Sequence, residues 1–144
     1  MPDNNNVITL HYDIEGNDFT SAGEASGDVK RVLRLLGISP DIIRRLAVAM
    51  YEGEINQVIH ANGGQIDVEI SPDVITLVLT DQGPGIPDVE AAMREGFSTA
   101  TDAIHDMGFG AGMGLPNMKK YSDTFQLETE VGKGTVITMT VKLT

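Results

Sequence analysis

The chain has 144 residues, no cysteine, and 21 acidic against 10 basic residues, which give a formal net charge of −11. This length suits one domain with its own core. The lack of cysteine excludes disulfides and thiolate metal sites. The negative charge disfavours nucleic acid or anionic lipid as the main ligand. The polar amino terminus lacks a secretory signal and no apolar run approaches a membrane span, so we expect a single soluble, cytoplasmic domain over residues 1–144, with residues 1–6 as a disordered tail.

The first half of the chain predicts a strand followed by two helices. Residues 7–13 alternate and are rich in branched side chains, which favours a strand. Apolar residues then recur at helical spacing over about residues 21–36. Ser39, followed by proline, is a helix start signal and predicts a second helix over residues 40–61. Residues 62–64 tolerate a left-handed conformation and are expected to end that helix.

The second half predicts two hairpins separated by helical and irregular segments. Alternating apolar residues indicate a hairpin over residues 65–80 and a closing hairpin over residues 124–143. A short helix is expected at residues 88–95 and another at residues 113–121. Between them, residues 96–112 are polar and lack a period, so we expect a loop there that acts as a lid.

Polar side chains interrupt two otherwise apolar elements. Glu52, Asn56 and His60 lie at i, i+4 and i+8 of the second helix and therefore near one face. Alone, such a row is more typical of a solvent-facing stripe. Asp81 ends the apolar face of a strand, and a buried carboxylate is costly without partners. We therefore expect Asp81 to meet a ligand or to cap a neighbouring backbone.

Two glycine clusters follow Asp81, at residues 83–85 and 108–114. This order suggests a nucleotide pocket with a flexible cover, in which the first cluster reads a base and the second holds phosphates. A dinucleotide turn is disfavoured because the spacing is not G-x-G-x-x-G, and residues 132–135 lack the spacing of a P-loop. A metal site at Asp102, His105 and Asp106 is less expected than a solvated loop.

Four sequence boxes in this order resemble the GHKL ATPase superfamily, the nucleotide-binding fold of gyrase, heat-shock chaperones, histidine kinases and mismatch-repair proteins. The boxes are Glu52 to Asn56 with His60, residues 81–87, residues 108–115, and Gly134-Thr135. More narrowly, the chain is similar to the anti-sigma factor serine/threonine kinases and switch kinases of bacterial partner-switching modules. The resemblance implies an α/β (α+β) two-layer sandwich of the Bergerat type, with a mixed, largely antiparallel sheet covered on one face by helices.

The resemblance also implies roles for individual residues. Glu52 would be the general base, Asn56 would bind Mg²⁺ between the ATP phosphates, and Asp81, helped by Thr135, would accept a hydrogen bond from adenine. Glycines of the first cluster would let the backbone pass close to the base, and the second cluster would offer backbone N–H groups to phosphate. The remaining nucleotide-binding residues would be Gly83, Gly85, Ile86, Gly108, Gly110, Ala111, Gly112, Met113, Gly114 and Leu115.

The function implied by the resemblance is that of an ATP-dependent serine/threonine protein kinase. Its substrate would be a STAS-domain anti-sigma antagonist, and a sigma factor, a phosphatase or a second copy of the chain are further partners that the family allows. The alternatives are an ATP-controlled binding module with little or no kinase activity, and a slow ATPase. Two departures from the family pattern are Gly53, where a small alanine is usual, and a longer lid. Glu54 is expected at the surface.

Overall fold

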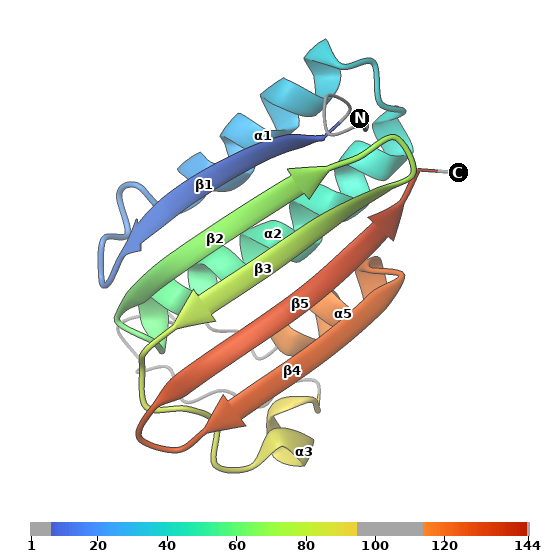
Figure 1. Cartoon of the computed structure of the whole chain (residues 1–144). Coiled ribbons are helices and arrows are strands. Elements are labelled where there is room, and N and C mark those ends of the chain that lie inside the picture. Colours follow the sequence, from blue (N-terminus) through green and yellow to red (C-terminus); the bar gives the residue numbers. More distant parts are fainter. Residues whose placement is uncertain (1–6, 95–113, 144) are drawn as a thin grey trace.

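The computed structural model describes residues 7–94 and 114–143, which form one sheet and a layer of helices (Figure 1). The sheet order is β1-β2-β3-β5-β4. The strands are β1 (Ile8–Glu15), β2 (Gly63–Ile70), β3 (Val74–Asp81), β4 (Thr124–Glu130) and β5 (Gly134–Lys142). The helices are α1 (Glu24–Leu35), α2 (Pro40–Ile59), α3 (Val89–Ala92) and α5 (Gly114–Tyr121). The expected fold class is confirmed; all four strand pairs of the described residues are antiparallel, so the sheet holds no parallel pair there.

The helices α1, α2 and α5 lie on one face of the sheet and close the core (Figure 1). Strand β3 shows how the sequence builds this layer, because Ile75, Leu77 and Leu79 alternate onto the helix side and are buried, as predicted. Leu46 of α2 and Met118 of α5 are fully buried against them. Burying each such side chain stabilises the fold by about 1.5–3 kcal/mol.

The helix boundaries differ from the predicted ones for local reasons. Helix α2 starts as predicted, with Ser39 accepting a hydrogen bond from the backbone N–H of Ile42 at 3.4 Å, but it ends at Ile59. Helix α1 begins at Glu24, about three residues later than predicted. Gly23 before it has a φ of 98°, a left-handed conformation that cannot continue into a helix.

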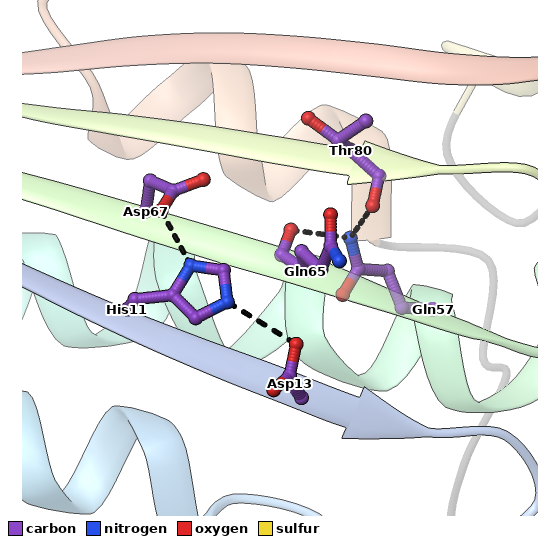
Figure 2. Close-up of polar contacts among 6 residues, drawn as sticks. All are labelled: His11, Asp13, Gln57, Gln65, Asp67 and Thr80. Atoms are coloured by element: carbon purple, nitrogen blue, oxygen red, sulfur yellow. Dashed lines mark hydrogen bonds and ion pairs between the residues drawn. The ribbon is translucent and has the colours of Figure 1, made fainter.

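The buried side chain of Gln57 ties α2 to the sheet at a point where two strands separate (Figure 2). Strands β2 and β3 pair as far as Gln65 and Thr80; beyond that point β2 pairs with β1, and β3 pairs with β5. The Gln57 Nε2 atom donates to the carbonyl oxygens of Gln65 and Thr80, each at 3.2 Å. The next residue of β3 is Asp81, so Gln57 fixes the backbone from which the Asp81 side chain projects.

The face of the sheet away from the helices is polar. In Figure 2, His11 of β1 lies between Asp67 of β2, at 2.6 Å, and Asp13, at 3.1 Å. These two carboxylates, with Asp67 as the largest cause, raise the pKa of His11 above its usual value. His11 lies in β1, as expected from the strand predicted over residues 7–13. Among the described helices, none is long and apolar enough to cross a membrane.

Candidate functional site

A row of half-buried polar residues follows one face of α2. Glu52, Asn56 and His60 succeed one another by one helical turn, as the sequence predicts. Within residues 7–94 and 114–143, the side chain of Asn56 has no hydrogen-bond partner in the structure, so its carboxamide oxygen is available to a ligand. Burial lowers the pKa of His60, which keeps its imidazole neutral at pH 7. His60 is the C-cap residue of α2, in agreement with its expected place at a helix end.

The Glu52 end of this row meets the first turn of α5. The Asn117 Nδ2 atom donates a hydrogen bond to Glu52 Oε2 at 3.1 Å. A Cβ atom placed on Gly114 would lie 3.9 Å from Glu52 Oε1, so both carboxylate oxygens are near α5. Leu115 is buried in the core and anchors this turn. The structure therefore brings Gly114 close to Glu52, with Leu115 buried beside it.

Asp81 and Thr135, which are expected to contact the base, form a row with Thr129 across three strands at one end of the sheet. Asp81 of β3 pairs with Thr135 of β5, which pairs with Thr129 of β4. The hydroxyl oxygens of Thr129 and Thr135 are 2.9 Å apart. Burial raises the pKa of the Asp81 carboxyl above its usual value, and backbone N–H groups of Gly83 and Thr135 oppose that rise. The carboxylate is thus largely withdrawn from water and placed beside a hydroxyl pair.

The loop after Asp81 is held by contacts that need glycine. Gly83 donates its backbone N–H to Asp81 Oδ1 at 3.0 Å, which confirms that Asp81 caps a neighbouring backbone. A Cβ on Gly83 would lie only 2.7 Å from the Cα of Ala61, just after α2. Gly85 has a φ of 78°, and Ile86 donates its N–H to Thr129 Oγ1 at 2.9 Å. In the structure the glycines are thus required by the protein's own packing, whatever ligand approaches them.

These contacts define two ends of one polar strip on α2. At Glu52 the strip meets the start of α5, and beyond His60 it meets the Gly83 loop. About 12 Å of helix axis separates positions 52 and 60, at 1.5 Å per residue. A nucleoside triphosphate can extend over such a distance, which is compatible with the expected base contact at Asp81 and the expected phosphate contact at Glu52 and Asn56.

The donor set also fits a magnesium ion held largely by phosphate. No group of three or more His, Cys, Asp or Glu side chains in the described ranges is arranged to hold a metal ion. Mg²⁺ commonly uses one or two protein oxygens together with substrate phosphates and water. The unpaired carboxamide of Asn56 would supply such an oxygen.

Glu54 corrects one expectation from the sequence. It was expected at the surface, but its side chain is 2% exposed. Its carboxylate accepts hydrogen bonds from the backbone N–H groups of Gly23, Ala25 and Ser26 and from the Ser26 hydroxyl, at 2.7 to 3.3 Å. A negative charge at the start of α1 is stabilised by the free N–H groups and by the helix dipole. Glu54 is therefore an anchor between α1 and α2.

Part of the predicted site lies outside the described residues. These are Gly108, Gly110, Ala111, Gly112 and Met113, together with the expected lid at residues 96–112 and the alternative metal ligands Asp102, His105 and Asp106. Sequence reasoning missed Gln57, Asn117 and Thr129. The predicted closing hairpin contained Thr129 but did not give the register that pairs it with Thr135.

A hollow elsewhere on the described surface, away from the polar strip on α2, does not suit a nucleotide. It measures about 460 Å³, lies between β1 and α1, and is lined by the carboxylates of Asp13, Glu15, Asp18, Glu24, Asp28 and Glu54. A concentration of negative charge repels phosphate. The strip on α2 is the better nucleotide site.

Comparison with known proteins shows the family of the chain. The family model described as "Histidine kinase-, DNA gyrase B-, and HSP90-like ATPase" matches residues 41–144. The chain is 35% identical over 112 residues to the serine/threonine-protein kinase RsbT of Bacillus subtilis, covering 75% of this chain and 78% of that protein. It is 33% identical over 103 residues to the anti-sigma F factor of Thermoanaerobacter sp., covering 68% of each.

Solved structures share the fold at lower identity. The structure of the RsbU and RsbW domains of Rv1364c from Mycobacterium tuberculosis matches with a TM-score of 0.64 and 15% identity, over 94% of this chain and 32% of that longer one. The mycobacterial sensor histidine kinase MprB matches with a TM-score of 0.53 and 22% identity, over 94% and 97% of the two chains. The chain belongs to the family of histidine kinase-, DNA gyrase B- and HSP90-like ATPases.

Proposed function

We propose that this protein is an ATP-dependent serine/threonine protein kinase of a bacterial partner-switching module. One observation carries the proposal: the carboxylate of Glu52 is held at the start of α5, one helical turn from Asn56, whose carboxamide has no hydrogen-bond partner among the described residues. This arrangement offers a proton acceptor beside a ligand for phosphate-bound Mg²⁺. Homology to a serine/threonine-protein kinase and to anti-sigma F factors supports the same function.

In the proposed reaction, Glu52 accepts the proton of a serine or threonine hydroxyl on the substrate protein. The hydroxyl oxygen then bonds to the γ-phosphorus, while the bond from that phosphorus to the β–γ bridging oxygen breaks and ADP leaves. Asn56 would hold the Mg²⁺ ion, whose charge offsets that of the phosphates. Asp81 would accept a hydrogen bond from the adenine amino group, and Thr135 would hold the base edge through its hydroxyl. Phosphoryl transfer depends mainly on such positioning and charge neutralisation.

The proposed substrate is a serine or threonine of a STAS-domain anti-sigma antagonist, with a sigma factor or a phosphatase as a further partner. Similarity to a serine/threonine-protein kinase, to anti-sigma F factors and to a structure with an RsbW domain supports partner switching as the setting. Since the proposed reaction consumes ATP, we place it in the cytoplasm. The net charge of −11 favours partners that present basic surface.

Transfer of phosphate from γ-labelled ATP tests the proposal. Purified protein is added to a lysate of the source organism, with Glu52→Gln and Glu69→Gln run beside it; Glu69 is an exposed carboxylate on β2. We expect a labelled small protein with the wild type and with Glu69→Gln, and only a small fraction of that label with Glu52→Gln. Labelling by Glu52→Gln at the wild-type rate would exclude Glu52 as the base.

A second function is favoured by the anti-sigma F factors, whose name denotes binding to a sigma factor. In that case ATP would control association with a partner, and little or no phosphate would be transferred. Tight Mg-ATP binding by the wild type without any labelled protein, and equal partner binding by Glu52→Gln, would support this function over the kinase.

A further inference from the structure

The hydrogen bond from Asn117 to Glu52 joins two helices at the proposed base. Asn117 is the fourth residue of α5 and is half-buried, and its Nδ2 atom lies 3.1 Å from Glu52 Oε2. The other oxygen, Oε1, faces Gly114 in the same turn. The two carboxylate oxygens therefore have different surroundings, although they are chemically equivalent in a free glutamate.

The packing around this contact holds both helices in place. Helix α5 is anchored on either side of Asn117 by Leu115, which is 7% exposed, and by Met118, which is fully buried. On α2, Gly53 has no side chain, and a Cβ there would lie 3.5 Å from the Met118 sulfur and would overlap Leu79. The absence of that Cβ allows α2 to lie close to Leu79 of β3, while Met118 of α5 packs beside the same position at ordinary contact distance. Asn117 is thus held where its amide reaches the carboxylate of Glu52.

We propose that Asn117 is a positioning residue for the phosphotransfer reaction. It occupies Oε2 of Glu52 and fixes the rotation of the carboxylate, so that Oε1 is the atom that accepts the substrate hydroxyl proton. This proposal rests on the proposed kinase function. A general base must lie within hydrogen-bond reach of the proton, and displacement by about 1 Å can reduce the rate by about 100-fold.

The kinetic test separates positioning from helix packing. Asn117→Ala should lower kcat by about 10- to 100-fold and leave the Kd of Mg-ATP and the midpoint of urea unfolding near the wild-type values. Asn117→Gln, which keeps a donor amide, should recover part of kcat. The matched control is Lys119→Ala, an exposed residue two positions along the same helix, which should leave kcat unchanged. A wild-type kcat in Asn117→Ala, or a fall matched by an equal loss of stability or ATP affinity, would overturn the proposal.

A double-mutant experiment distinguishes positioning of Glu52 by Asn117 from a purely structural role of Asn117. In the Glu52→Gln background, Asn117→Ala should have no further effect on residual transfer, because the base that it positions is already absent. If the Asn117→Ala effect persists undiminished in that background, Asn117 does not act through Glu52.

A measurement without nucleotide keeps the proposal separate from the kinase assignment. The side-chain amide resonances of Asn117 should shift in Glu52→Ala, whereas those of Asn17, which donates to Asn62 at 3.4 Å, should not. If this shift is present but the wild type transfers no phosphate to any protein, the contact exists and the kinase function fails. If transfer is present but the shift is absent, the positioning proposal alone fails.

Discussion

The close approach of α2 to the sheet at Gly53 leads to a specific prediction about stability. Gly53→Ala gains about 1 kcal/mol of helix propensity, but the added Cβ would overlap the Leu79 side chain, which is 2% exposed. Overfilling a packed core costs about 1–3 kcal/mol. The net result should be a loss of about 0–2 kcal/mol in the free energy of unfolding.

Gly27 provides the matched control, because it lies inside α1 and a Cβ there would have no atom within 4 Å. Gly27→Ala should raise the free energy of unfolding by about 1 kcal/mol from propensity alone. Urea denaturation followed by circular dichroism would give both values, and the two variants should differ by about 1–3 kcal/mol. Adding Leu79→Val to Gly53→Ala should recover part of the difference. Equal stabilisation by both alanines would refute the inferred contact between α2 and Leu79.

Three further predictions concern charged groups. Glu54→Gln should lower the free energy of unfolding by about 2–3 kcal/mol, because an amide nitrogen would face the N–H groups at the start of α1. The exposed Glu24→Gln is the control. A loss no larger than that of the control would contradict the role of Glu54 as an anchor between α1 and α2. Asp67→Asn should lower the pKa of His11 toward its usual value in an NMR titration. The sign follows from the raised pKa: His11 stabilises the fold of the wild type at low pH, and this contribution is lost as the pH rises through the folded-state pKa. An unchanged titration would show that Asp67 does not hold the imidazole. Asp81→Asn should not lower the melting temperature of the nucleotide-free protein at pH 7. The reason is that burial raises the pKa of Asp81, so that its ionised form destabilises the fold above that pKa. A fall of several degrees would show that the carboxylate stabilises the fold.

Local patterns predicted most of the elements. Alternation identified the strands and placed Leu79 and Asp81 on one face, while Ser39 and the following proline marked the start of α2. Helical spacing placed Glu52 and Asn56 on one face because residues one helical turn apart share a face in any α-helix, and their proposed roles came from the family resemblance. These features depend on neighbours in the sequence and therefore need no tertiary contact to be recognised.

Features that depend on distant contacts were missed or misplaced. Glu54 looks like a surface residue in the sequence, but its partners are Gly23, Ala25 and Ser26, about 30 residues earlier. The bond from Asn117 to Glu52 spans 65 positions. Gly53 was expected only to weaken its helix, and its packing role follows from the approach of Leu79 and Met118. Each of these depends on how α2 packs, which helical periodicity does not specify.

Calorimetric titration of the purified protein with Mg-ATP and Mg-GTP tests the proposed adenine site at Asp81 most directly. Asp81→Asn should weaken Mg-ATP binding by about 10- to 100-fold, the loss expected for one hydrogen bond to a charged group. Asp67→Asn makes the same chemical change on the opposite face of the sheet and should leave the affinity unchanged, and the wild type should bind Mg-GTP far more weakly than Mg-ATP. Wild-type Mg-ATP affinity in Asp81→Asn would contradict the assignment of the nucleotide site at the end of β3.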